Sequence, residues 1–219
     1  MALIQSLQPA EDFPPTSEAL DYPNGLLAIG GDLTPERLLS AYRQGIFPWF
    51  EAQQPVLWWT PDPRSVLFPD DLHISRSLRK TLRQDAFELT VDRQFNRVIR
   101  ACAEAREAGP GTWIDDAMIA AYTTLHHMGY AHSIEVVEDG ELVGGLYGVA
   151  IGSAFFGESM FSRRTDASKV ALVALVHLLK SAGFKLIDCQ VESAHLNTLG
   201  ASNISRLDFE QWLAQTRTE

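Results

Sequence analysis

Apolar and polar residues alternate along several segments in the second half of the chain, which is the period expected of β-strands. This alternation predicts strands over residues 132–137, 141–151, 153–161 and 185–191. The dipeptide Asp139-Gly140 between the first two strands is typical of a tight hairpin turn. Helical spacing of apolar residues predicts helices over 116–128 and 167–182, each ended by a glycine. The chain therefore has the pattern of a mixed α/β protein.

The beginning of the chain differs, because it is rich in proline, glycine and aromatic residues. One helix is clear there, over 34–44, with Thr34 as its N-cap and Pro35 at its first position. The change of pattern predicts a small N-terminal domain over residues 1–63, followed by a second domain over residues 64–219.

The second domain is expected to have an α/β (α+β) fold in which a helix connects two parallel strands. This order of elements resembles the core of GNAT-like acyltransferases, which bind an activated acyl donor where two central strands splay apart. A fold by itself does not give a function, so the candidate chemistry has to come from side chains.

Two polar residues, Asp188 and Gln190, interrupt the apolar strand that follows the long helix. A period of two puts them on one face of the strand, roughly 7 Å apart. A buried carboxylate and amide cost free energy unless they are hydrogen-bonded, so the pair indicates either a functional site or a polar network that closes the core.

Basic residues gather in two short helical segments, although the net charge of the chain is −10. Ser75 can cap a helix whose exposed face carries four cations, with Leu78 and Leu82 opposite. These cations are Arg76, Arg79, Lys80 and Arg83. The next helix is expected to repeat the design with Arg93, Arg97 and Arg100. Such stripes are either solvated faces or phosphate-binding surfaces.

Composition is ordinary for a soluble globular protein, with 46% hydrophobic and 21% charged residues. We expect no signal peptide and no membrane span, because the longest apolar run is short and contains His177. Cys102 and Cys189 are expected to be reduced core residues, which fits the cytoplasm. The histidines show no metal spacing, and no phosphate-binding loop occurs, so neither a metal nor another cofactor is expected.

Three of the five tryptophans, Trp49, Trp58 and Trp59, lie close together in the N-terminal region. They predict either a small aromatic core or a platform on which nucleic-acid bases stack.

Eight motifs in order along the chain resemble the leucyl/phenylalanyl-tRNA–protein transferase family. They are NGLLAIGGDL (24–33), GIFPWF (45–50), WWTPDPR (58–64), HISRS (73–77), GTWI (111–114), HSIEV (132–136), GESMFSR (157–163) and DCQV (188–191). The resemblance implies transfer of leucine, phenylalanine or methionine from aminoacyl-tRNA to proteins with an N-terminal arginine or lysine, which marks them for degradation. The donor ester is already activated, so no cofactor is implied, and nothing in the sequence demands more than a monomer.

The resemblance also implies roles for individual residues. Asp188 and Gln190 are expected to be catalytic, Asp188 by aligning the acceptor ammonium and Gln190 by orientation. Glu158 is expected to bind the basic acceptor, although it could instead be a cap or a partner of Arg163. The expected substrate-binding residues further include Trp49 and Trp113, which would contact the terminal adenosine, and a donor pocket formed by Leu146, Phe155, Gly157, Met160, Leu172, Leu175, Leu179 and Ile187. Arg76, Arg79, Lys80 and Arg83 would contact tRNA phosphates.

Two other functions fit parts of the pattern. An acyltransferase dependent on acyl-coenzyme A would need backbone amides for the pyrophosphate at a strand-to-helix turn, and the turn over 163–169 has no glycine. A non-catalytic module that grips charged tRNA would explain the basic stripe and the tryptophans, but it gives no reason for Asp188 and Gln190.

Overall fold

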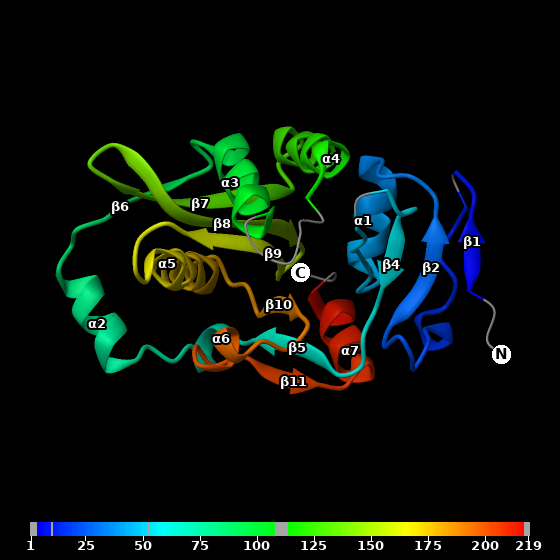
Figure 1. The fold of residues 1–219 in the computed structure, drawn as a ribbon. Helices are drawn as coiled ribbons and strands as arrows, with labels where there is room; N and C mark the ends of the chain where they lie inside the picture. Colours follow the sequence, from blue (N-terminus) through cyan, green and yellow to red (C-terminus); the bar gives the residue numbers. More distant parts are fainter. Residues whose placement is uncertain (1–3, 10, 52, 108–113, 217–219) are drawn as a thin grey trace.

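The computed structural model describes residues 4–9, 11–51, 53–107 and 114–216. Its strands form two sheets, one of four strands near the N-terminus and one of seven strands in the remainder of the chain. In Figure 1 the small sheet lies on the right and the large sheet on the left, with the C-terminal helix α7 between them. Within the described residues no helix is long and apolar enough to cross a membrane.

The small sheet has the strand order β1-β2-β4-β3. Its strands are β1 (Gln5–Leu7), β2 (Leu26–Gly30), β3 (Phe47–Pro48) and β4 (Leu57–Trp59). A short 3-10 helix, η1 (Thr16–Glu18), precedes β2, and helix α1 (Pro35–Arg43) follows it. Thr34 is the N-cap of α1 and Pro35 its first residue, which confirms the predicted start.

The large sheet has the strand order β11-β5-β10-β9-β8-β7-β6. Its strands are β5 (Arg64–Leu67), β6 (Glu88–Val91), β7 (Ala131–Glu138), β8 (Glu141–Ile151), β9 (Ala154–Ser162), β10 (Leu186–Gln190) and β11 (Ser202–Ile204). The β7–β8 hairpin turns at Asp139 and Gly140, both of which have positive φ. The four strands predicted from the alternation are therefore confirmed to within one residue at each end.

Helices cover both faces of the large sheet (Figure 1). Helix α5 (Ala167–Ser181) packs on one face, and α3 (Phe95–Glu107) and α4 (Asp116–His127) pack on the other. The remaining helices of this part of the chain are η2 (Pro69–Asp71), α2 (Arg76–Arg83), α6 (Ala194–Asn197) and α7 (Arg206–Thr216). The neighbouring residues Leu146 and Tyr147 on β8 belong to different hydrophobic clusters. Leu146 packs in the cluster of α5, and Tyr147 packs in the cluster of α3 and α4.

The connection β9–α5–β10 joins two parallel neighbouring strands, as the GNAT-like prediction requires. The pairing of β9 with β10 runs from Leu186↔Ala154 to Asp188↔Phe156 and then stops, although β9 continues to Ser162. The two strands thus diverge in the middle of the sheet, and the mixed α/β, GNAT-like fold is confirmed.

The two sheets share a core. A single cluster of buried residues contains Tyr42 and Trp58 from the N-terminal part together with Tyr122, Phe156 and Phe209. Division into two domains at residues 63 and 64 therefore stays a prediction, although the change from one sheet to the other does occur between Trp59 and Arg64.

Candidate active site

A cavity of about 240 Å³ opens where β9 and β10 diverge. Most of the residues expected to form the donor pocket line it: Leu146, Phe155, Gly157, Met160, Leu172, Leu175 and Ile187. Leu179 does not; it is buried in the α5 cluster one turn beyond Leu175, so its inclusion in the pocket was wrong. Glu158, Asp188 and Gln190 line the same cavity, which therefore combines an apolar interior with polar groups at one place.

Sequence reasoning missed several residues of the lining. They are Tyr147, Ser159, Cys189, Val191, Ser193, His195 and Leu196. Most of the missed positions lie after β10, where the chain turns into α6 and the alternation ends. Burial raises the pKa of the Cys189 thiol well above its ordinary value, which disfavours the reactive thiolate form.

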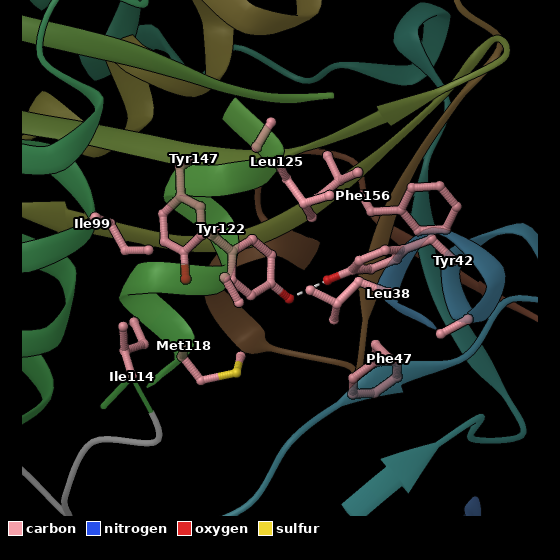
Figure 2. Close-up of a cluster of buried hydrophobic side chains, with 14 of the residues drawn as sticks. Leu38, Tyr42, Phe47, Ile99, Ile114, Met118, Tyr122, Leu125, Tyr147 and Phe156 are labelled. Atoms are coloured by element: carbon pink, nitrogen blue, oxygen red, sulfur yellow. Dashed lines mark hydrogen bonds between the residues drawn. The ribbon is translucent and has the colours of Figure 1, made fainter. Parts of the chain in front are cut away.

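Glu158 lies at the centre of a cluster contributed by four elements. Tyr42 on α1 donates a hydrogen bond to its Oε1 at 2.7 Å, and Tyr122 on α4 donates to its Oε2 at 3.0 Å. Gln190 on β10 donates from Nε2 to Oε1 at 3.0 Å. Figure 2 shows the hydroxyls of Tyr42 and Tyr122 pointing at each other and joined by a hydrogen bond. Arg163, the alternative partner, pairs with Glu104 instead.

The cluster needs a third proton. Tyr42, Tyr122 and Glu158 make three mutual oxygen contacts, but the two hydroxyls carry only two hydrogens. A protonated Glu158 supplies the third. Its hydroxyl then donates to one tyrosine in place of accepting from it, and that tyrosine donates to the other, so that each contact has one hydrogen. Burial, opposed by the two tyrosine hydrogen bonds and reinforced by the nearby Asp188, raises the pKa of Glu158 to about 7. Geometry and electrostatics therefore agree that this carboxyl can hold a proton near neutral pH.

Asp188 has a partner that sequence reasoning did not foresee. Arg64, the first residue of β5, donates from Nε to Asp188 Oδ1 at 2.8 Å and from Nη2 to Oδ2 at 2.7 Å. Both side chains are essentially inaccessible to solvent. The charge of Asp188 is thus already neutralised within the protein, which removes the basis for expecting it to attract an ammonium group directly.

Gln190 is not placed by simple alternation. The register of β10 with β5 shifts between Asp188 and Gln190, and Gln190 has φ of 63°. Its backbone N–H donates to Asp188 Oδ1 at 2.9 Å, while its side chain reaches Glu158. The expectation that Asp188 and Gln190 project from one regular face was therefore wrong, because a bulge separates them.

The three N-terminal tryptophans differ in burial, which bears on whether they form an aromatic core or a stacking platform. Trp58 is fully buried and packs edge-on against Phe13, so it is a core residue. Trp49 is 47% exposed and lies 5.7 Å from Trp59 between ring centroids. Trp49 is thus partly open to solvent, whereas Trp113 lies outside the described residues.

Helix α2 presents the four predicted cations to solvent. Arg76, Arg79, Lys80 and Arg83 are all exposed, and none of them pairs with an acid among the residues that the structure describes. Ser75 caps the helix by accepting from the Leu78 N–H at 3.2 Å. The second stripe is less regular than predicted, because Arg93 precedes α3 and only Arg97 and Arg100 belong to the helix.

Comparison with known proteins identifies the family. The family model described as leucyl/phenylalanyl-tRNA protein transferase matches residues 66–214, and the model of its N-terminal domain matches residues 31–62. A protein of Pseudomonas entomophila named leucyl/phenylalanyl-tRNA–protein transferase is 61% identical over 93% of this chain and 90% of its own length. A protein of the same name from Nitrosomonas europaea is 59% identical over 97% of this chain and 90% of its own.

Two solved structures are much less similar to this chain. The structure of L-PGS from Bacillus licheniformis is 11% identical and covers 76% of this chain and 53% of its own, with a TM-score of 0.44. A GCN5-related N-acetyltransferase from Kribbella flavida is 12% identical over 76% of this chain and 60% of its own, with a TM-score of 0.40. Neither overlap supports an argument about function, whereas the sequence matches do, and the chain belongs to the leucyl/phenylalanyl-tRNA–protein transferase family.

Proposed function

We propose that this chain transfers leucine, phenylalanine or methionine from aminoacyl-tRNA to the α-amine of proteins that begin with arginine or lysine. Membership of the family supports the coarse reaction, which is transfer of an aminoacyl group from tRNA to protein. The protein acts as a monomer in the cytoplasm, without a cofactor, and the transfer marks the acceptor for degradation.

The observation that carries the proposal is the combination of an apolar cavity with Glu158 and Gln190 at its polar side. The cavity of about 240 Å³ is smaller than the pockets of drug-sized ligands, which suits a single amino-acid side chain. Its interior residues Leu146, Phe155 and Leu172 are almost completely buried and offer no polar side-chain atom, so they favour an apolar side chain.

Glu158 is the proposed binding group for the basic acceptor. An ammonium or guanidinium that approaches this carboxyl stabilises its ionised form, so acceptor binding is expected to displace the proton that the cluster holds. A peptide α-amine has a pKa of about 8, which leaves a useful neutral fraction for attack on the ester. Gln190 would then orient the reacting groups, and positioning supplies much of the rate.

Helix α2 is the proposed contact for tRNA phosphates, because its four exposed cations have no acidic partners among the described residues. Trp49 is the proposed stacking partner of the terminal adenosine, since aromatic rings bind bases through their faces. Both features fit a donor that is a nucleic acid rather than a small thioester.

The coenzyme A alternative is disfavoured at the turn where a pyrophosphate would bind. Asp166, whose carboxylate would repel phosphate, is the N-cap of α5 and pairs with Lys169 at 2.8 Å. The Ser168 N–H at this helix start already donates to Ser162 Oγ at 3.2 Å. One amide at this helix start is therefore occupied, and a carboxylate stands at the position of the N-cap, unlike a good phosphate site.

One set of incubations separates the three candidate functions. The protein is mixed with Leu-tRNA labelled on leucine and a peptide that begins with arginine, and acetyl-coenzyme A replaces the tRNA in a parallel tube. Labelled peptide in the first tube alone supports the proposal. Acetylated peptide favours the coenzyme A alternative, and tRNA binding without product favours the non-catalytic module.

The acceptor preference provides a second test. Peptides beginning with arginine or lysine should react, whereas those beginning with glutamate or carrying an acetylated amine should not. Glu158→Gln should reduce the ratio of the transfer rate for peptides with a basic N-terminal residue to the rate for peptides with a neutral one. If this ratio of rates is the same in Glu158→Gln and wild type, Glu158 does not bind the acceptor.

A further inference from the structure

Arg64 is a buried arginine fixed by an ion pair and two aromatic rings. Its guanidinium lies 4.8 Å from the ring centroid of Phe47 on β3 and 4.5 Å from that of Phe209 on α7. Its side chain is essentially inaccessible, and it makes the two parallel hydrogen bonds to Asp188 that match a guanidinium to a carboxylate. The N-terminal sheet and the C-terminal helix thus combine to hold this group in a single orientation.

Asp188 connects Arg64 to the cavity. Its Oδ1 accepts from Arg64 Nε and also from the backbone N–H of Gln190 at 2.9 Å. Removing the guanidinium would leave a buried carboxylate without compensation, which would take up a proton or move. In either case the acceptor for the Gln190 N–H would be weakened or displaced.

Gln190 depends on that acceptor. Its φ of 63° is in the left-handed region, which side chains other than glycine seldom occupy without local support. The Asp188 carboxylate provides the support by closing a turn around the bulge. This conformation directs the Gln190 side chain to Glu158, where it donates at 3.0 Å.

We propose that Arg64 is a positioning residue for the transfer reaction, acting through Asp188 to hold Gln190 in its left-handed conformation against Glu158. Asp188 then serves as a fixed acceptor and not as a base. The order of contacts is Arg64 to Asp188, Asp188 to the Gln190 backbone, and the Gln190 side chain to Glu158. The activity tests of this inference rest on the proposed function.

A lysine at position 64 keeps the positive charge but cannot make two parallel hydrogen bonds. Arg64→Lys should lower kcat at saturating peptide by roughly 10- to 100-fold, because small displacements of positioning groups cost that much. The Michaelis constant for tRNA should stay the same, since α2 is untouched.

Arg37 provides a matched control. It is also buried, lies 5.6 Å from the Phe13 ring, and donates two hydrogen bonds, to the carbonyls of Glu11 and Gln8. It does not line the cavity. Arg37→Lys should leave kcat within twofold of wild type. Equal losses in the two lysine variants would show that Arg64 acts only on stability and would overturn the proposal.

A double-mutant cycle tests whether the effect passes through Gln190. In a protein that already carries Gln190→Ala, Arg64→Lys should lower kcat by no more than about threefold, because the group to be positioned is gone. If Arg64→Lys lowers kcat as much in the Gln190→Ala protein as in wild type, Arg64 does not act through Gln190. If Arg64→Lys does not fold, Arg64→Met combined with Asp188→Leu removes the pair without leaving a buried charge and should show the same loss of kcat.

Amide hydrogen exchange tests positioning without any activity. The Gln190 N–H should be protected in the wild-type protein and exchange at least tenfold faster in Arg64→Lys, while amides in the centre of β8 keep their rates. Unchanged Gln190 exchange would overturn the proposal even if activity falls. Failure of the proposed function would appear separately, as no transfer by the wild-type protein, and the exchange result would still decide the role of Arg64.

Discussion

The hydroxyl of Tyr42 donates to Glu158 Oε1 at 2.7 Å and so connects helix α1 to strand β9. The two residues are 116 positions apart in the sequence, and they come from parts of the chain that form different sheets. The N-terminal part is therefore a structural component of the candidate site and supplies one of its hydroxyl groups.

Tyr42→Phe removes this hydroxyl and keeps the ring that packs 5.0 Å from Phe156. Loss of one buried hydrogen bond should destabilise the protein by about 1 kcal/mol. Because the Tyr42 hydrogen bond lowers the pKa of Glu158, its loss should raise that pKa further and increase the Michaelis constant for an arginine peptide severalfold at pH 7. Steady-state kinetics with varied peptide measure this; an unchanged constant would mean that the hydroxyl does not influence acceptor binding.

Stability should depend on pH through Glu158. Its pKa is raised from 4.5 to about 7, so between these values the folded protein retains a proton that the unfolded chain has lost. Stability from this group is fully present below pH 4.5 and is lost as pH rises through about 7. Relative to Glu158→Gln, which cannot titrate, the wild type should lose roughly 3 kcal/mol over this window.

Urea unfolding of both proteins at several values between pH 4.5 and pH 8 measures the difference, and all other titrating groups cancel in it. A constant difference between wild type and Glu158→Gln across this range would show that Glu158 ionises normally in the folded protein.

The salt dependence of tRNA binding should follow the charges of α2. Phosphate contacts release counterions, so affinity should fall steeply with salt. Reversing Arg76, Arg79, Lys80 and Arg83 to glutamate should raise the Michaelis constant for tRNA and flatten its salt dependence, with acceptor affinity unchanged. Filter binding at several salt concentrations tests this, and the same changes at Arg97 and Arg100 on α3 serve as a control with a weaker expected effect. Unaltered tRNA binding by the α2 variant would show that tRNA binds to a different surface of the protein.

Asp188 and Gln190 should respond differently to substitution. Gln190→Ala should reduce kcat by up to about 100-fold with little loss of stability, since the side chain is only partly buried. Asp188→Asn leaves the buried Arg64 without its counter-charge and should destabilise by roughly 3–5 kcal/mol as well as reduce transfer. Paired kinetics and thermal unfolding separate these outcomes; a fully stable Asp188→Asn with normal turnover would contradict the importance of the pair.

Much of the fold could be predicted because it depends on local pattern. The period of two in β7, β8 and β9 and the glycine after α4 are properties of short segments. Many of the cavity residues could also be predicted, because the family resemblance implies them.

The missed features depend on distant contacts. Arg64 and Asp188 are 124 positions apart, and nothing near Arg64 distinguishes a buried arginine from an exposed one. Tyr42 and Tyr122 occupy helix positions that any core aromatic could fill, so their hydroxyl contacts with Glu158 have no local signal. The bulge at Gln190 results from the Asp188 carboxylate and from pairing with β5, and strict alternation fails there.

The cavity between β9 and β10 is proposed to receive the side chain of the transferred amino acid. Leucine, methionine and phenylalanine branch no earlier than Cγ and should enter, whereas valine and isoleucine branch at Cβ and should clash near the ester. One methylene group changes binding by only about 1–3 kcal/mol, so the shape of the cavity has to contribute to rejection. Met160→Trp, which fills the cavity, should reduce phenylalanine transfer most.

The most direct test is a competition in one tube between Leu-, Phe-, Val- and Ile-tRNA for a single arginine peptide, with the products identified by mass spectrometry. We expect leucyl and phenylalanyl peptides with little valyl or isoleucyl product, and a selective loss of the phenylalanyl product with Met160→Trp. Equal transfer of leucine and isoleucine, unaffected by Met160→Trp, would show that the residues around this cavity are ordinary core and that the donor binds elsewhere.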